Sequence, residues 1–166
     1  MNANNFYELL VSKKSSIFTE VLKYGVFVAL VVLIIASFFF SPIAFLIMAI
    51  ITAVYYIFIF PKFEVEYEYT LVDSSLTIDE IYSKKKRKHL MDIRLGDAEL
   101  IAPYPSSRLE RLGNAKKVDC SSRDPESRPL AIVCRDSGTL QCVLIQADDK
   151  LKELIKRYAF SKYFED

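Results

Sequence analysis

The chain has 166 residues, and its 22 Lys and Arg against 21 Asp and Glu give a formal net charge of +1. This near-neutral balance lacks the basic excess that is typical of general nucleic-acid binding. Apolar residues make up 52% of the chain but are unevenly placed, because residues 24–60 contain no charged side chain. That asymmetry excludes an ordinary soluble globular protein.

Residues 1–20 are predicted to form an N-terminal tail. Phe6, Leu9 and Leu10, followed by Ile17 and Phe18, recur at roughly helical spacing around a polar stretch. The spacing is compatible with a short amphipathic helix lying in a membrane interface. A frayed terminus fits the same residues, and both readings stay open.

The uncharged segment predicts a two-span transmembrane hairpin over residues 21–60. As one helix, its 37 residues would reach about 55 Å, whereas a bilayer core is roughly 30 Å thick. Ser41-Pro42 lies near the middle, and a proline there interrupts a helix. We therefore expect a first span at Val21–Phe40 and a second at Ile43–Phe60, with Lys23 extending toward the headgroups.

The lysines flanking the spans predict the topology. Lys13, Lys14 and Lys23 lie at the first span and Lys62 follows the second, whereas the Ser41-Pro42 connection is uncharged. The positive-inside rule then places both termini in the cytoplasm of a multi-pass cell-membrane protein. Residues 24–60 contain none of the ionisable side chains that mark ion or proton paths, so we interpret the hairpin as an anchor.

Residues 62–166 are predicted to be a cytoplasmic domain that begins with a β-hairpin. The stretch 63–72 alternates strictly between apolar residues and a polar face that carries Glu64, Glu66 and Glu68. Period two over ten residues predicts a half-buried antiparallel strand with these glutamates in solvent. A turn at Asp73-Ser74-Ser75 and a second strand at Leu76–Tyr82 follow.

A run of five basic residues comes next and is the candidate binding site. It comprises Lys84, Lys85, Lys86, Arg87 and Lys88, and His89 follows it. A solvated hairpin loop is one interpretation, and contact with anionic lipid headgroups is the other. The choice depends on whether the run points toward the bilayer or away from it.

The rest of the domain predicts short strands and a terminal helix. For the hairpin after Leu130 we expect a three-residue loop, Asp136–Gly138, which sets Cys134 opposite Leu140. Asp148–Phe164 has an apolar stripe with acidic residues at its start and basic ones near its end, as in an amphipathic helix. The fold class is therefore α+β: a transmembrane hairpin, an antiparallel β-sheet or bent barrel, and a C-terminal helix.

Residues that would carry chemistry are sparse, so we predict no catalytic residue, no metal and no cofactor. The only histidine lies beside the basic run, and Cys120, Cys134 and Cys142 lack the C-x-x-C spacing of a metal site. Four glycines form no phosphate-binding loop. A hydrolase that uses Cys120 or His89 is the weakest hypothesis.

The layout resembles small bacterial two-helix membrane proteins with a pleckstrin-homology-like (PH-like) cytoplasmic domain. The resemblance covers the strand at Phe63–Leu71 leaving the membrane, the strand at Leu76–Ile81 and the basic stretch Lys84–Lys88. It implies a seven-stranded bent barrel capped by the C-terminal helix. It transfers no functional residue, because no diagnostic motif is present.

These observations favour a non-enzymatic membrane-anchored module. Its cytoplasmic domain would bind a protein partner or anionic lipid headgroups, and nucleic acid is not an expected partner. The alternative is an accessory subunit of a larger membrane complex, held through the hairpin. In that case the aromatic and small residues of the spans would pack on partner helices: Phe38–Phe40, Ala44, Ala49 and Ala53.

Overall fold

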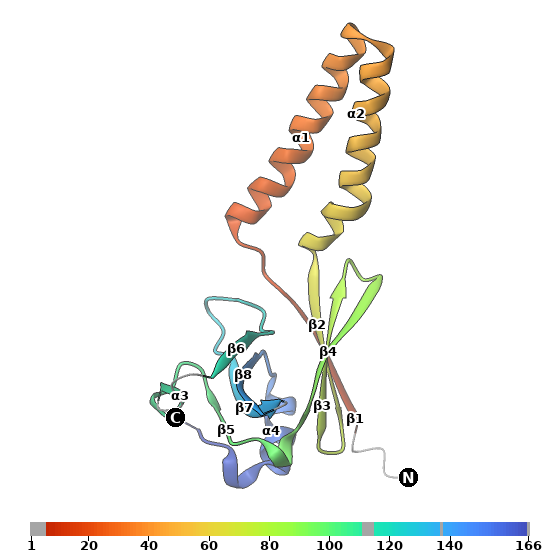
Figure 1. The fold of residues 1–166 in the computed structure, drawn as a ribbon. Helices are drawn as coiled ribbons and strands as arrows, with labels where there is room; N and C mark the ends of the chain where they lie inside the picture. Colours follow the sequence, from red (N-terminus) through yellow and green to blue (C-terminus); the bar gives the residue numbers. More distant parts are fainter. Residues whose placement is uncertain (1–5, 111–114, 137, 166) are drawn as a thin grey trace.

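Two long apolar helices extend from a domain built of two β-sheets (Figure 1). The computed structural model describes residues 6–110, 115–136 and 138–165. Helix α1 spans Ile17–Phe40 and α2 spans Pro42–Val54, and α2 continues through a π-helical turn at Tyr55–Ile59 and a 3₁₀ turn at Phe60–Phe63. The segments Ile17–Phe40 and Pro42–Ile59 are long and apolar enough to cross a membrane.

The chain reverses at Ser41, as the Ser41-Pro42 pair predicts. Ser41 is extended (φ −166°, ψ 136°), and its hydroxyl accepts a hydrogen bond from the Ile43 amide at 3.3 Å. Pro42 takes the first helical position, where its missing amide hydrogen is not needed. The first helix begins four residues before the predicted span, at Ile17.

Residues 6–12 form a strand, so neither a helix nor a frayed terminus describes this part of the predicted tail, and residues 1–5 lie outside the described residues. Strand β1 (Phe6–Ser12) pairs antiparallel with β2 (Val65–Val72), from Phe6 opposite Val72 to Ser12 opposite Glu66. Its odd-numbered residues pack on the core and its even-numbered ones face outward. The helical hairpin is therefore inserted between two neighbouring strands of one sheet.

The first sheet has the order β1-β2-β3-β4, with β3 at Ser75–Tyr82 and β4 at Lys86–Arg94. The alternation predicted for β2 is confirmed, because Tyr67, Tyr69 and Leu71 are buried in the core. The turn to β3 is also confirmed: Val72 pairs with Ser75. Asp73 in the turn has a left-handed φ of 51°.

The second sheet has the order β5-β7-β8-β6, and β6 runs parallel to β8. Its strands are β5 (Leu100–Pro103), β6 (Lys116–Asp119), β7 (Leu130–Asp136) and β8 (Thr139–Ile145), with a short helix α3 (Ser107–Glu110) after β5. The described residues thus form eight strands in two four-stranded sheets. The predicted α+β class is confirmed, but the seven-stranded bent barrel that the resemblance implied is not, because no strand pairing joins one sheet to the other in the described chain.

The register predicted for the β7–β8 hairpin is wrong. Cys134 lies opposite Gln141 and Arg135 opposite Leu140, so the connection is one residue shorter than expected. Gly138 sits in this connection with a φ of 84°. The prediction assumed one buried face per strand, but Leu130, Ala131, Ile132 and Val133 are all buried, so alternation did not mark the register.

Helix α4 (Asp149–Tyr158) adds Leu151 and Ile155 to the core shared by the two sheets. Asp148 caps it, because its Oδ1 accepts a hydrogen bond from the Leu151 amide at 2.9 Å. The predicted helix is confirmed but ends earlier, and a 3₁₀ turn at Phe160–Lys162 follows. In Figure 1, α4 lies at the end of the domain away from the two long helices.

Candidate membrane-surface site

The basic run forms the tip of the β3–β4 hairpin. Ser83 and Lys84 both have left-handed backbones, with φ of 46° and 58°, which tightens the turn. The Ser83 amide donates a hydrogen bond to the Glu64 carbonyl at 2.9 Å, directly after α2 and its terminal turns. The tip therefore points to the same end of the domain as the helical hairpin (Figure 1).

An open crevice separates this tip from the end of the second span. Tyr56, Phe58 and Phe60 line one side of the crevice, and Lys85, Lys86 and Lys88 line the other. Tyrosine and tryptophan side chains collect at the level of lipid headgroups. The run thus lies beside the part of the hairpin where a bilayer surface is expected.

Four of the five basic side chains form no ion pair in the described part of the chain, and we call them the lysine tip: Lys84, Lys85, Lys86 and Lys88. Arg87 differs from them. Its guanidinium lies 2.6 Å from a Glu68 carboxylate oxygen and 3.9 Å from one of Asp79. The expected five-residue site is therefore four exposed lysines and one arginine held against the sheet.

Glu68 corrects the prediction of a fully solvated glutamate face, because its side chain is only 5% exposed. Burial raises the pKa of Glu68, the neighbouring Glu8 raises it further, and the Arg87 charge opposes the rise. The alternating pattern placed Glu68 on the outer face correctly. It gave no sign that Glu68 would lie between β1 and β3 on that face and against Arg87 of β4.

His89 extends this charged group along β4. Its Nδ1 lies 2.9 Å from an Asp79 oxygen and its Nε2 lies 3.3 Å from an Asp92 oxygen. The hydrogen bond to Asp79 raises the pKa of His89, as do the charges of Asp79 and Asp92. Two carboxylates flanking one imidazole favour a structural ion-pair role for His89.

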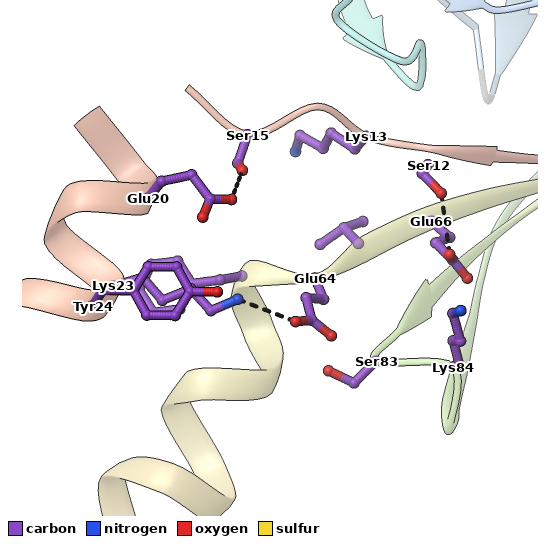
Figure 2. A pocket seen from close by; sticks show the side chains of 12 residues that line it. Ser12, Lys13, Ser15, Glu20, Lys23, Tyr24, Glu64, Glu66, Ser83 and Lys84 are labelled. Atoms are coloured by element: carbon purple, nitrogen blue, oxygen red, sulfur yellow. Dashed lines mark hydrogen bonds and ion pairs between the residues drawn. The ribbon is translucent and has the colours of Figure 1, made fainter. Parts of the chain in front are cut away.

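An ion pair joins the start of α1 to the start of β2. Lys23 Nζ lies 3.1 Å from Glu64 Oε1, and the Lys23 side chain is only 4% exposed (Figure 2). The ammonium also lies over the rings of Tyr24 and Phe60, at 5.2 Å and 4.4 Å from their centroids. Lys23 was expected to extend toward the lipid headgroups, but in the structure its ammonium group pairs with Glu64 of the β domain.

The linker between β1 and α1 is also fixed to the domain. The Lys13 amide donates to the Val65 carbonyl at 3.0 Å, and the Lys14 amide donates to the Ser122 carbonyl at 2.7 Å. The Lys14 ammonium lies 2.6 Å from an Asp124 oxygen. Since both chain connections are anchored, the hairpin has a defined orientation relative to the lysine tip.

The span residues considered for partner helices do not form one surface. Ala44 and Ala49 are half-buried, and α1 is the helix that packs against α2. Phe39 and Phe40 are almost fully exposed at the hairpin tip. Lipid chains and a partner helix fit these aromatic side chains equally well, so they do not specify a partner.

Burial disfavours the charged thiolate form of the three cysteines. Cys120 is buried, and burial raises its pKa to about 12, which favours the less reactive thiol form at neutral pH. Burial also raises the pKa values of Cys134 and Cys142. Among the described residues, no group of three His, Cys, Asp or Glu side chains could hold a metal ion.

The fold and this site define an α+β domain of two sheets and a C-terminal helix, with an apolar helical hairpin inserted after its first strand. A family model described as "Bacterial PH-like domain (DUF6106)" matches residues 3–165. The chain therefore belongs to this family of bacterial PH-like domains. No curated protein and no solved structure matches it.

Proposed function

We propose that this protein is a non-enzymatic membrane-anchored module whose lysine tip contacts anionic lipid headgroups. The proposal rests on the position of the lysine tip, which lines the same crevice as the aromatic end of the second span. Four exposed ammonium groups beside the bilayer surface match the chemistry of phosphate headgroups. The family of PH-like domains agrees with a binding module of this kind.

The expected energy of the contact is small, and its effect is orientation. A basic residue near an anionic surface gains ~1 kcal/mol, so the four lysines gain at most about 4 kcal/mol together. Screening over about 8 Å at physiological ionic strength reduces this value. Because the two spans already hold the chain in the membrane, headgroup contact would serve to fix the domain against the surface.

The proposal places both termini in the cytoplasm of a cell-membrane protein. The lysines flanking the spans support this topology through the positive-inside rule. The cytoplasmic leaflet also carries the anionic lipids that a cationic tip would meet. Labelling of a cysteine introduced near residue 165 by an impermeant reagent in intact cells would contradict it.

The sequence contains no tryptophan, so a single introduced one reports local depth. Lys85→Trp marks the tip, and Phe160→Trp marks an exposed site in the turn that follows α4, the helix at the far end of the domain (Figure 1). The full chain is placed in nanodiscs with headgroup-proximal brominated lipid, either zwitterionic or anionic. We expect Lys85→Trp to be quenched more strongly in the anionic disc, with the excess lost at high salt, and Phe160→Trp to be unaffected.

A charge-removal variant completes the test. Changing Lys84, Lys86 and Lys88 to Gln in the Lys85→Trp background removes the remaining cations of the tip. The difference between anionic and zwitterionic discs should then fall by at least half. Equal quenching of Lys85→Trp in both lipids, or an unchanged difference after charge removal, would overturn the proposal.

A further inference from the structure

The two edges of the first sheet have opposite character. The β4 edge carries the charged residues of the basic run, and its register shifts at Ile78/Asp79. Charges and irregularities of this kind protect an edge strand against pairing with another chain. The β1 edge reads Phe-Tyr-Glu-Leu-Leu-Val-Ser, with one charge, no lysine, no proline and an unbroken register over seven residues.

The free side of β1 is open within the described chain. Its strand partner is β2, and among the described residues the first backbone hydrogen bond to a segment other than β2 comes after the strand, from the Lys14 amide to the Ser122 carbonyl. The inward-facing side chains are occupied; the Tyr7 hydroxyl, for example, donates to Asp148 at the start of α4. The backbone N–H and C=O groups on the free side of β1 are thus available to pair with another strand, while the inward-facing side chains of β1 are already packed on the core.

The outward-facing side chains of β1 alternate between apolar and acidic residues. Phe6 and Leu10 are 61% and 51% exposed. Glu8 lies between them on the same face and forms no ion pair among the described residues. Glu8 hydrogen-bonds to Glu68, whose carboxylate also faces Arg87, and the exposed Glu8 side chain is the acidic group between the two apolar ones.

We propose that the β1 edge binds an extended segment of a partner protein, which adds as a fifth strand of the first sheet. Main-chain hydrogen bonds would supply the affinity, and alternate side chains would supply the specificity. The segment would carry a basic residue beside Glu8 and apolar residues beside Phe6 and Leu10, on a period of two. This proposal goes beyond headgroup contact and does not depend on it.

A second copy of the chain is not expected to bind the β1 edge, because both copies would have to lie in the same membrane. In every copy β1 runs toward the helical hairpin (Figure 1), so antiparallel pairing of two β1 strands would invert one copy relative to the bilayer. A twofold axis along the membrane normal keeps both copies upright, and it places each β1 residue at the same height as the identical residue of the other copy. In a parallel pair, however, a residue whose backbone groups face the partner strand lies opposite one whose groups face away. Identical residues at the same height cannot meet this condition, so a symmetric parallel pair is excluded as well.

The test uses the full chain in zwitterionic nanodiscs, so that cationic peptides do not bind the lipid. The probes are three labelled ten-residue peptides of alternating Val and Thr: one with a central Lys, one with a central Glu, and one with Lys and a neighbouring Pro. We expect the Lys peptide to bind at least tenfold more tightly than the other two. Hydrogen exchange should slow at residues 6–12 on binding and stay unchanged at β4.

Two substitutions and one control make the assignment specific. Glu8→Lys should reverse the preference toward the Glu peptide, whereas Glu153→Lys on the exposed side of α4 should leave it unchanged. Leu10→Lys should weaken binding of the Lys peptide at least tenfold, while exchange protection of β2 and β3 shows that the domain stays folded. Absence of binding at millimolar peptide, protection outside β1, or a preference unmoved by Glu8→Lys would overturn the proposal.

Discussion

Lys23 and Glu64 lie on opposite sides of the helical hairpin in the sequence, yet their charged atoms are 3.1 Å apart. Lys23 belongs to the first turns of α1, and Glu64 comes directly after the last turn of the second span. The pair therefore closes the base of the hairpin. A second bond, from the Tyr55 hydroxyl to the Lys23 carbonyl at 3.1 Å, holds the same junction.

The two partners of this pair should respond unequally to substitution. Glu64→Gln leaves the buried Lys23 ammonium without its counter-charge, and we expect a cost of about 1–3 kcal/mol in the stability of the junction. Lys23→Met leaves only the exposed Glu64 carboxylate, so it should cost less than about 1 kcal/mol. Hydrogen exchange of amides 64–67 in nanodiscs measures the loss of junction stability in both variants. Equal losses would contradict the prediction that burial of Lys23 makes the loss of its counter-charge more costly.

Arg87 should be important for stability, unlike the lysines around it. Arg87→Gln removes the charge that faces buried Glu68, and we expect the free energy of unfolding to fall by about 1–3 kcal/mol. Lys86→Gln, on the same exposed hairpin, should change it by no more than about 0.5 kcal/mol. Chemical denaturation of the domain in detergent compares the two variants. A loss as large for Lys86→Gln would contradict the division of the basic run.

Acidification from pH 8 toward pH 6 should stabilise the domain through His89. The pKa of folded His89 is raised above its ordinary value of 6.5, so the folded state binds the proton more tightly than the unfolded state. This stabilisation is complete below pH 6.5 and is lost as the pH rises through the folded-state pKa. Thermal unfolding against pH measures it, and His89→Gln should flatten the slope in this window. An unchanged slope would refute the assignment.

Strand β1 should be required for the domain to fold. Residues 62–166 alone leave β2 with an unpaired edge, and Tyr69 and Leu71 lose the cover of Tyr7 and Leu9. We expect this fragment to aggregate or to unfold without a cooperative transition. A chain in which residues 1–14 are joined to residues 62–166 by a flexible Gly/Ser linker should fold cooperatively, as circular dichroism can show. Cooperative folding of the short fragment would contradict the role of β1.

Local sequence patterns predicted those elements whose burial depends only on the spacing of their own apolar and polar residues. The uncharged stretch 24–60 predicts two apolar helices, because a helix buries its backbone bonds within itself. The alternation at 63–72 and the apolar stripe of α4 likewise depend on one element meeting one core face. These features are confirmed.

Only the tertiary structure decided the features that depend on distant partners. Phe6–Ser12 becomes a strand because β2 lies beside it after the chain has passed through the whole hairpin. Glu68 is buried because it lies between β1 and β3 and against Arg87 of β4. The β7–β8 register could not be predicted, because residues on both faces of β7 are buried. Periodicity records how often a chain meets a buried face. It does not record which segment provides that face, and here the decisive segment lies more than fifty residues away.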